Sequence, residues 1–190
     1  MRNEELIELG AVCGRFQIFH NDHLKYVLAA KKRCKHLMIG ITSADPSVSP
    51  AEKTDKNRNK RSANPCTYYE RMIIIEKALH DLGWTNEEFH IIPFPIGKPM
   101  LLKYYLPQDA VCFFTIYDEW GMEKLERLRN EGYGIEVLWK KNKKSLSSTY
   151  IRSLMAEGHD WKSFVPKATY QYITEHHIDE RIIGMMKMGD

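Results

Sequence analysis

Two short stretches of the sequence gather side chains suited to binding phosphate. In the first, Gly14, Arg15 and Phe16 follow an apolar run and lead to His20 and His23. Two imidazoles spaced i and i+3 at a helix start can point to one side and donate hydrogen bonds to a phosphate whose charge rises during attack. The guanidinium is a planar cation for a second phosphate, and the glycine lets the backbone approach a ligand closely. In isolation, a pair of surface histidines explains the pattern equally well, and a zinc site lacks a third ligand nearby.

The second stretch lies more than a hundred residues later and opens another helix. Ser147 and Ser148 are good helix caps, and Thr149 follows them directly. Their hydroxyls, together with the backbone N–H groups of a helix start, can hold phosphate. Arg152 lies one turn further into the same helix. As an isolated string, the stretch is also typical of an ordinary capped helix.

Alternating strands and helices are expected to position these residues. The order predicts right-handed β-α-β units, and hence an α/β fold with a parallel sheet and helices on both faces. Ligands of such sheets bind at the carboxyl ends of the strands, where both stretches are expected. Thr67 and Glu70 form a plausible capping box, and Gly158 is a plausible helix end. The expected strands are 7–13, 36–42, 90–94, 110–116 and 134–139, and the expected helices are 21–35, 67–82, 119–131, 148–157 and 167–177.

Length and composition favour a single globular domain over residues 1–190, with C-terminal helices over about 148–185 packed on it. The chain is 43% hydrophobic and 28% charged, and its net charge of +3 permits anionic ligands without predicting nucleic-acid binding. No apolar run approaches the roughly 18 residues of a membrane span, and the acidic, polar N-terminus is unlike a secretory signal. The four scattered cysteines, Cys13, Cys34, Cys66 and Cys112, are expected to be free and buried. A cytoplasmic protein without nucleic-acid or membrane partners is the expectation.

Residues 46–63 differ in character from the rest of the chain, because Ser, Pro, Asn, Asp and Lys dominate. Five cations lie between Lys53 and Arg61, with Asp55 as the only acid among them. The composition predicts a mobile basic loop. Such a loop is either a solvated surface segment or a lid that closes over anionic ligands.

Taken together and in this order, the two stretches resemble the nucleotidyltransferase superfamily of the HIGH type. The pattern GRFxxxHxxH follows the first expected strand, and SSTxIR follows the last. Within that superfamily, the chain resembles the archaeal-type nicotinamide-nucleotide adenylyltransferases, which make NAD from ATP and nicotinamide mononucleotide. Further similar segments are Asn64–Arg71 (NPCTYYER), Ile91–Pro93 (IIP) and Trp161–Pro166 (WKSFVP), so that the resemblance extends from about Val12 to Ile182.

The resemblance implies an enzyme with a Rossmann-like fold that binds ATP or CTP and a small phosphorylated acceptor. An acceptor oxygen would attack the triphosphate in line, with no protein nucleophile, so the enzyme would supply position and charge. Mg²⁺ would be held mainly by the triphosphate rather than by protein ligands. The resemblance implies His20, His23 and Arg152 as catalytic residues, and Gly14, Arg15, Phe16, Ser147, Ser148 and Thr149 as substrate-binding residues.

Some positions depart from the family pattern. Asp22 stands in place of the glycine of His-x-Gly-His, where its side chain could clash, repel phosphate or point outward. The Asp and Trp that follow the IIP strand in the archaeal enzymes are absent, and Trp120 either stacks on a base or anchors its helix. The first expectation is an enzyme like the nicotinamide-mononucleotide adenylyltransferases. The alternative is a cytidylyl- or adenylyltransferase with another phospho- or phosphono-acceptor, and the second alternative is a non-catalytic nucleotide-binding protein. Self-association is left open as well.

Overall fold

The computed structural model describes residues 5–44, 60–141 and 145–188. The chain divides into two compact units, each built from three segments of sequence. The first unit comprises Met1–Gly14, Lys25–Thr42 and Thr85–Lys144, and the second comprises Arg15–Leu24, Ser43–Trp84 and Ser145–Asp190. Most of the expected basic loop 46–63, namely residues 46–59, lies outside the described residues.

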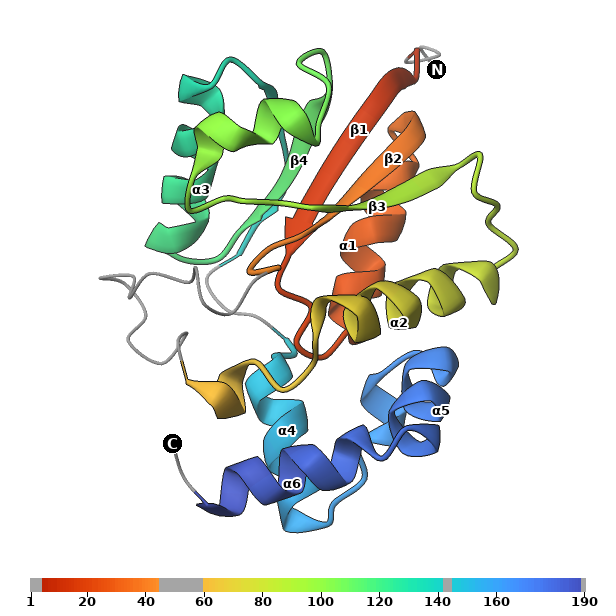
Figure 1. Cartoon of the computed structure of the whole chain (residues 1–190). Coiled ribbons are helices and arrows are strands. Elements are labelled where there is room, and N and C mark those ends of the chain that lie inside the picture. Colours follow the sequence, from red (N-terminus) through yellow and green to blue (C-terminus); the bar gives the residue numbers. More distant parts are fainter. Residues whose placement is uncertain (1–4, 45–59, 142–144, 189–190) are drawn as a thin grey trace. The chain divides into compact units, whose positions relative to one another are not determined.

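The first unit is built on a parallel sheet of five strands in the order β3-β2-β1-β4-β5. From β1 the chain first moves to β2 and β3, and then returns to the other side of β1 for β4 and β5 (Figure 1). This order confirms the expected Rossmann-like fold and places a topological switch point between β1 and β4. The strands are β1 (Ile7–Gly14), β2 (Cys34–Ile41), β3 (Phe89–Pro93), β4 (Val111–Ile116) and β5 (Gly134–Lys140).

Alternating side chains of β4 pack against helices on the two faces of this sheet. Cys112, Phe114 and Ile116 join Leu125 and Leu128 of α3 (Glu119–Asn130) in one buried apolar cluster. The intervening Phe113 points to the other face, which is covered by α1 (Asn21–Lys31). On that face, a side chain at Gly10 would meet the Phe113 ring at 2.5 Å, so only glycine fits this close approach.

The second unit contains the remaining long helices and the loop that follows β1. Within it, α4 packs on α6, and α5 packs on α2 and α6 (Figure 1). Buried Ile173 and Ile178 lie in its core. The helices are α2 (Tyr68–His80), α4 (Ser148–Glu157), α5 (Lys167–Glu175) and α6 (Ile178–Met188), with short 3-10 turns η2 (Arg61–Ala63) and η4 (Lys162–Phe164); a third turn, η3 (Pro99–Tyr104), belongs to the first unit.

Local capping signals fix where α2 and α4 begin and end. Thr67 and Glu70 form both hydrogen bonds of the expected capping box at the start of α2. The Ser147 hydroxyl caps α4 by accepting from the Tyr150 N–H. Gly158 ends α4 in the left-handed conformation at φ 71°, which glycine adopts without strain. Helix 148–157 is therefore confirmed at both ends.

The structure differs from expectation at the end of α1 and at the C-terminus. Helix α1 ends at Lys31 rather than residue 35, because β2 already begins at Cys34, which pairs with Ile7 of β1. The expected last helix, 167–177, ends at Glu175, and α6 follows it as a separate helix. The expectation of free, buried cysteines is confirmed for all four.

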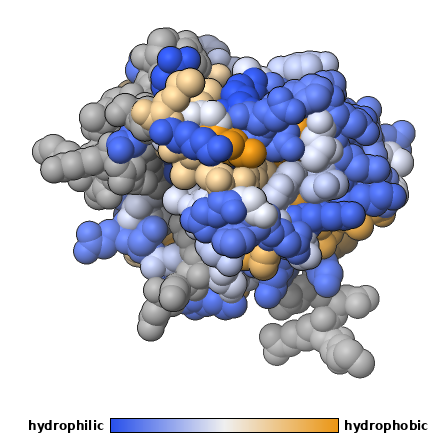
Figure 2. Space-filling model, turned by 90° about the horizontal axis from the view of Figure 1, so that it is seen from below, coloured by the Kyte–Doolittle hydropathy of each residue, from blue (hydrophilic) through white to orange (hydrophobic). Residues whose placement is uncertain are grey.

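Figure 2 shows one face on which polar and charged side chains predominate, with a small group of apolar side chains among them. No helix in the described part of the chain has both the length and the apolar character that crossing a membrane requires.

Candidate active site

The loop after β1 is held by two side chains of α4. The Ser148 hydroxyl donates to the Ile18 carbonyl at 3.0 Å, and the Arg152 guanidinium donates to the Gln17 carbonyl. Arg152 is 4% exposed and also donates to the Thr149 hydroxyl at 3.2 Å. The two stretches that were separated in the sequence are thus joined directly within the second unit.

Helix α2 holds the same loop from a second direction. Arg71 is 2% exposed and donates to three backbone carbonyls: those of Thr67 at 3.1 Å, Arg15 at 2.8 Å and Ser43 at 2.9 Å. Burial lowers its pKa to about 10. A guanidinium presents its donors in a rigid fork, so one side chain can fix several strands of backbone at once.

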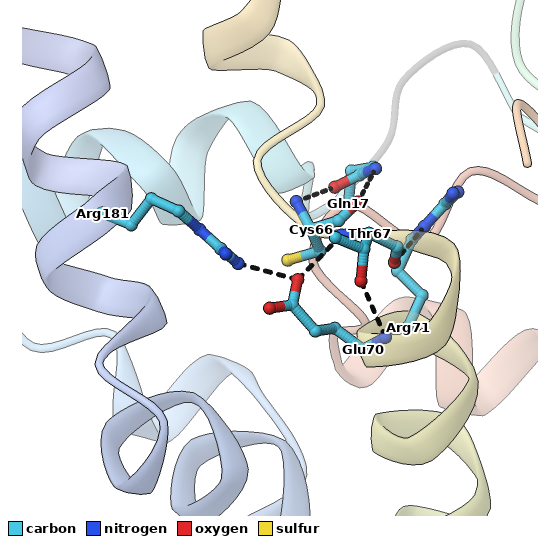
Figure 3. A network of polar contacts seen from close by, with 6 residues as sticks. All are labelled: Gln17, Cys66, Thr67, Glu70, Arg71 and Arg181. Atoms are coloured by element: carbon cyan, nitrogen blue, oxygen red, sulfur yellow. Dashed lines mark hydrogen bonds and ion pairs between the residues drawn. The ribbon is translucent and has the colours of Figure 1, made fainter. Parts of the chain in front are cut away.

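The Gln17 amide completes this attachment, as Figure 3 shows. It accepts from the Cys66 N–H and donates to the Cys66 carbonyl, both at 2.8 Å. The network continues through the capping box to Glu70, which accepts from Arg181 of α6 at 2.7 Å (Figure 3). The start of α2 therefore connects the loop after β1 with the C-terminal helix.

His20 and His23 cap each other at the start of α1. The His23 N–H donates to Nδ1 of His20 at 3.3 Å, and the His20 N–H donates to Nδ1 of His23 at 3.4 Å. The rings stack with centroids 3.6 Å apart and planes 16° apart. An Nδ1 that accepts cannot carry a proton, so each neutral ring carries its proton on Nε2. This reciprocal cap therefore makes Nε2 the hydrogen-bond donor of both rings.

Aromatic side chains support the histidine pair. The rings of Phe16 and Phe19, both buried, lie 5.0 Å and 5.9 Å from the His23 ring. Phe16 has φ 52°, a conformation that costs a non-glycine residue about 1–3 kcal/mol. Its neighbours at 15 and 17 are the residues whose carbonyls Arg71 and Arg152 hold. These contacts stabilise an unfavourable backbone at the point where the chain leaves β1.

Asp22 neither clashes nor points away from the second stretch. Its Oδ2 accepts from the Leu146 N–H at 2.9 Å. Leu146 directly precedes Ser147, the N-cap of α4. The residue that replaces the family glycine thus links the first turn of α1 to the start of α4.

Most of the predicted site residues belong to one compact unit. The second unit brings together His20, His23, Arg15, Phe16, Ser147, Ser148, Thr149 and Arg152. Gly14 and Trp120 belong to the first unit, where Gly14 ends β1 and its carbonyl accepts from the Thr42 N–H. Trp120 is buried at the start of α3, with the Arg127 guanidinium 4.8 Å above its ring. Base stacking by Trp120 stays a prediction, while its packing within its own unit is observed.

The arrangement has the chemical groups that binding an anion requires. It presents imidazole, hydroxyl and guanidinium donors, together with the N-termini of α1 and α4, whose partial positive charge favours phosphate. Over residues 5–44, 60–141 and 145–188, no group of three or more His, Cys, Asp or Glu side chains is arranged to hold a metal ion. Mg²⁺ would fit here through phosphate oxygens, because hard cations prefer oxygen ligands.

Comparison with known proteins decides the family. The family model described as cytidylyltransferase-like matches residues 11–154, from the first strand to the second stretch. The chain belongs to this family. It is a nucleotidyltransferase, and the resemblance read from GRFxxxHxxH and SSTxIR is confirmed.

This nucleotidyltransferase is similar in sequence to two groups of known enzymes. A phosphonoformate cytidylyltransferase of Streptomyces viridochromogenes is 42% identical over 182 residues, covering 96% of this chain and 99% of that protein. Nicotinamide-nucleotide adenylyltransferases of Thermococcus kodakarensis and Saccharolobus solfataricus are 31% and 29% identical, covering 93% and 91% of this chain and 88% and 94% of theirs.

A solved structure confirms the fold. The bifunctional NMN adenylyltransferase/ADP ribose pyrophosphatase of Francisella tularensis aligns with a TM-score of 0.69 over 96% of this chain. Its sequence is 16% identical, so the likeness concerns the fold alone. This chain spans about half of that protein, 54% of its length.

Two residues of the site were missed from the sequence. Arg71 lies inside a helix, where a charged residue is usually solvated. Its side chain is nevertheless buried and donates hydrogen bonds to three backbone carbonyls. Gln17 has no distinctive local pattern, and its partner Cys66 is far away in sequence. The one available signal was the similarity of the segment from Asn64 to Arg71 to the family, which marks the segment without giving the role of its arginine.

Proposed function

We propose that this nucleotidyltransferase transfers a cytidylyl group from CTP to a small acceptor that bears a phosphonate. The similarity to the phosphonoformate cytidylyltransferase carries the proposal, because the two sequences are 42% identical and the alignment covers nearly the whole of both chains. The acceptor segment after β3 supports it, since it reads Phe94-Pro95-Ile96-Gly97 and lacks the Asp and Trp of the archaeal adenylyltransferases.

In the proposed reaction, the triphosphate lies at the N-termini of α1 and α4. An oxygen of the acceptor attacks the α-phosphorus, the bond from that phosphorus to the bridging oxygen of the β-phosphate breaks, and pyrophosphate leaves with the bonding electrons. The Nε2–H groups of His20 and His23 donate to phosphate oxygens as their charge rises. Arg15 and Arg152 supply fixed positive charge beside them. Mg²⁺, carried in by the triphosphate, supplies further charge neutralisation when bound.

The remaining residues bind and orient in this scheme. Ser147 and Thr149 present hydroxyls at the start of α4, beside the N–H groups of its first turn. The Ser148 hydroxyl, which donates to the Ile18 carbonyl, orients the loop after β1, and Gly14 and Phe16 shape that loop. Trp120 is the proposed aromatic contact to a base. The family and the retained histidine pair favour this enzyme over a non-catalytic nucleotide-binding protein. We place the reaction in the cytoplasm, with no nucleic-acid or membrane partner.

A nicotinamide-mononucleotide adenylyltransferase is the second candidate. It is supported by the relatives of Thermococcus kodakarensis and Saccharolobus solfataricus, which cover most of this chain. In that case ATP would replace CTP in the same phosphate cradle, and the acceptor would be a ribonucleotide rather than a phosphonate.

A matrix of substrates separates the two candidates. CTP and ATP are each incubated with phosphonoformate or nicotinamide mononucleotide and Mg²⁺, and pyrophosphate release is measured while ³¹P NMR identifies the product. We expect turnover with CTP and phosphonoformate, at least tenfold above ATP with the same acceptor. Turnover confined to ATP and nicotinamide mononucleotide would overturn the proposal in favour of the second candidate.

A further inference from the structure

Asp22 offers a contact that the glycine of the family pattern cannot make. It is the second residue of α1 and lies between His20 and His23. Its carboxylate accepts from the N–H of Leu146, a residue 124 positions later in the sequence, at 2.9 Å. A glycine at this position has no side chain, so this bond is a property of the present sequence.

The Leu146 N–H that Asp22 binds lies just before the start of α4. Leu146 directly precedes the N-cap and lies two residues before the first residue of α4, where no helical hydrogen bond is available to its N–H. The next residues are the cap Ser147, and then Ser148, which donates to the Ile18 carbonyl. Fixing Leu146 therefore fixes the direction from which the chain enters α4.

Asp22 adds a different attachment from those of Ser148 and Arg152. Those two residues lie within α4 and hold carbonyls of the loop after β1. Asp22 lies within α1, directly beside the histidines, and holds the backbone in front of α4. With this bond, the starts of the two helices are joined to each other as well as to the loop between β1 and α1.

We propose that Asp22 is a positioning residue that holds the N–H groups at the start of α4 in a fixed place relative to His20 and His23. The proposal rests on the proposed function, because it assumes that both helix starts bind one triphosphate. A preorganised cradle binds phosphate without first ordering its own backbone. Asp22 acts through Leu146 and does not touch the ligand.

The test compares substitutions at Asp22 in the full chain. Asp22→Asn keeps an oxygen that can accept from Leu146 and removes the charge, whereas Asp22→Ala and Asp22→Gly remove the acceptor. We expect Asp22→Ala and Asp22→Gly to raise the Kd for CTP and Mg²⁺, measured by calorimetry, about tenfold or more. Asp22→Asn should stay within about threefold of the wild type. In steady state, the KM for the triphosphate should rise while the KM for the acceptor stays unchanged.

Asn21→Ala is the matched control. The Asn21 amide donates to the Ser163 carbonyl of η4 at 3.1 Å, so this variant also loses a side-chain bond from the start of α1 to distant backbone. Its partner is the Ser163 carbonyl rather than the backbone in front of α4, and we expect the Kd for CTP to stay within about twofold. Hydrogen exchange of the Leu146 amide, followed by NMR, should accelerate in Asp22→Ala and Asp22→Gly but not in Asp22→Asn or Asn21→Ala.

The outcomes are distinguishable. Unchanged affinity in Asp22→Ala, or tighter binding in all three Asp22 variants, would overturn the positioning role. Equal losses in Asp22→Asn and Asp22→Ala would assign the effect to charge and would also overturn it. Wild-type protein that binds neither CTP nor ATP would overturn the proposed function, and that result appears before any variant is compared.

Discussion

The reciprocal cap gives His20 and His23 a structural role in addition to the phosphate binding that we propose for them. Each Nδ1 accepts a backbone N–H at the start of α1, as the Thr and Glu side chains do in a capping box. Each Nε2 carries the proton that a phosphate oxygen would accept. Replacing either histidine with alanine therefore removes a cap along with a phosphate donor, and the two effects have to be separated.

A glutamine at position 23 separates them, because glutamine is a common residue at this position of a capping box. We expect His23→Gln to keep the melting temperature near that of the wild type while kcat falls by roughly 10²–10³. His23→Ala should show the same loss of kcat and also lose about 1 kcal/mol of stability. Steady-state kinetics and thermal melts measure both quantities. Near-normal kcat in His23→Gln would refute the role of the imidazole in the reaction.

Arg152 is more deeply embedded than a surface phosphate ligand. It is buried and donates to the Gln17 carbonyl and the Thr149 hydroxyl, which excludes an ordinary exposed salt bridge. We expect Arg152→Lys to weaken triphosphate binding because the planar fork is lost, and Arg152→Ala to weaken it further and lower the melting temperature. Calorimetry with CTP and a thermal melt would test this. Wild-type affinity in a folded Arg152→Ala protein would leave Arg152 with a structural role only.

At the scale of elements, the start of α2 is joined to α6 by an ion pair that depends on pH. Burial by itself would raise the pKa of the Glu70 carboxyl, but hydrogen bonds from Arg181 and from the Thr67 N–H outweigh burial and lower it below its ordinary value of 4.5. A carboxyl whose pKa is lowered by folding stabilises the protein above its unfolded pKa, and the contribution is lost as pH falls through the folded pKa.

The corresponding prediction compares wild type with Glu70→Gln. At pH 7 the wild type should melt at the higher temperature, and its advantage should shrink as the pH falls below about 4.5. Melting curves between pH 7 and pH 3 measure the difference. An advantage that stays constant over this range would show that the carboxylate charge contributes nothing to the pairing with Arg181.

Elements with local signals could be predicted from the sequence, whereas those set by distant partners could not. Ser147 and Gly158 marked both ends of α4, and Thr67 with Glu70 marked the start of α2. The end of α1 was missed because β2 starts where Cys34 pairs with Ile7, a contact that no local pattern records.

The same distinction holds at the site. The histidines and the serines were recognisable because their types and spacing carry phosphate chemistry. Arg71 and Gln17 were not, because their roles arise from carbonyls and amides that converge only in the folded chain. The bond between Asp22 and Leu146 belongs to this second class, since its acceptor and donor are 124 residues apart.

At the scale of the whole molecule, a ligand bound by the folded chain alone should raise its stability. A ligand present at 100 times its Kd adds about 2.7 kcal/mol, which corresponds to roughly 5–10 °C in melting temperature for a chain of this size. We expect CTP with Mg²⁺ to give such a shift, and ATP a smaller one at the same concentration. Differential scanning fluorimetry measures both. A larger shift with ATP would contradict the proposed use of CTP.

The partner of Asp22 is a backbone amide, and this has a consequence for how the chain could have diverged from its relatives. Every residue except proline offers that amide, so an aspartate could arise at position 22 without a matching change at position 146. Glycine and aspartate are neighbours in the genetic code, which makes the exchange a short mutational step in either direction. The contact could therefore arise in one lineage without a compensating mutation, and an aspartate at position 22 is expected alongside many different residues at 146.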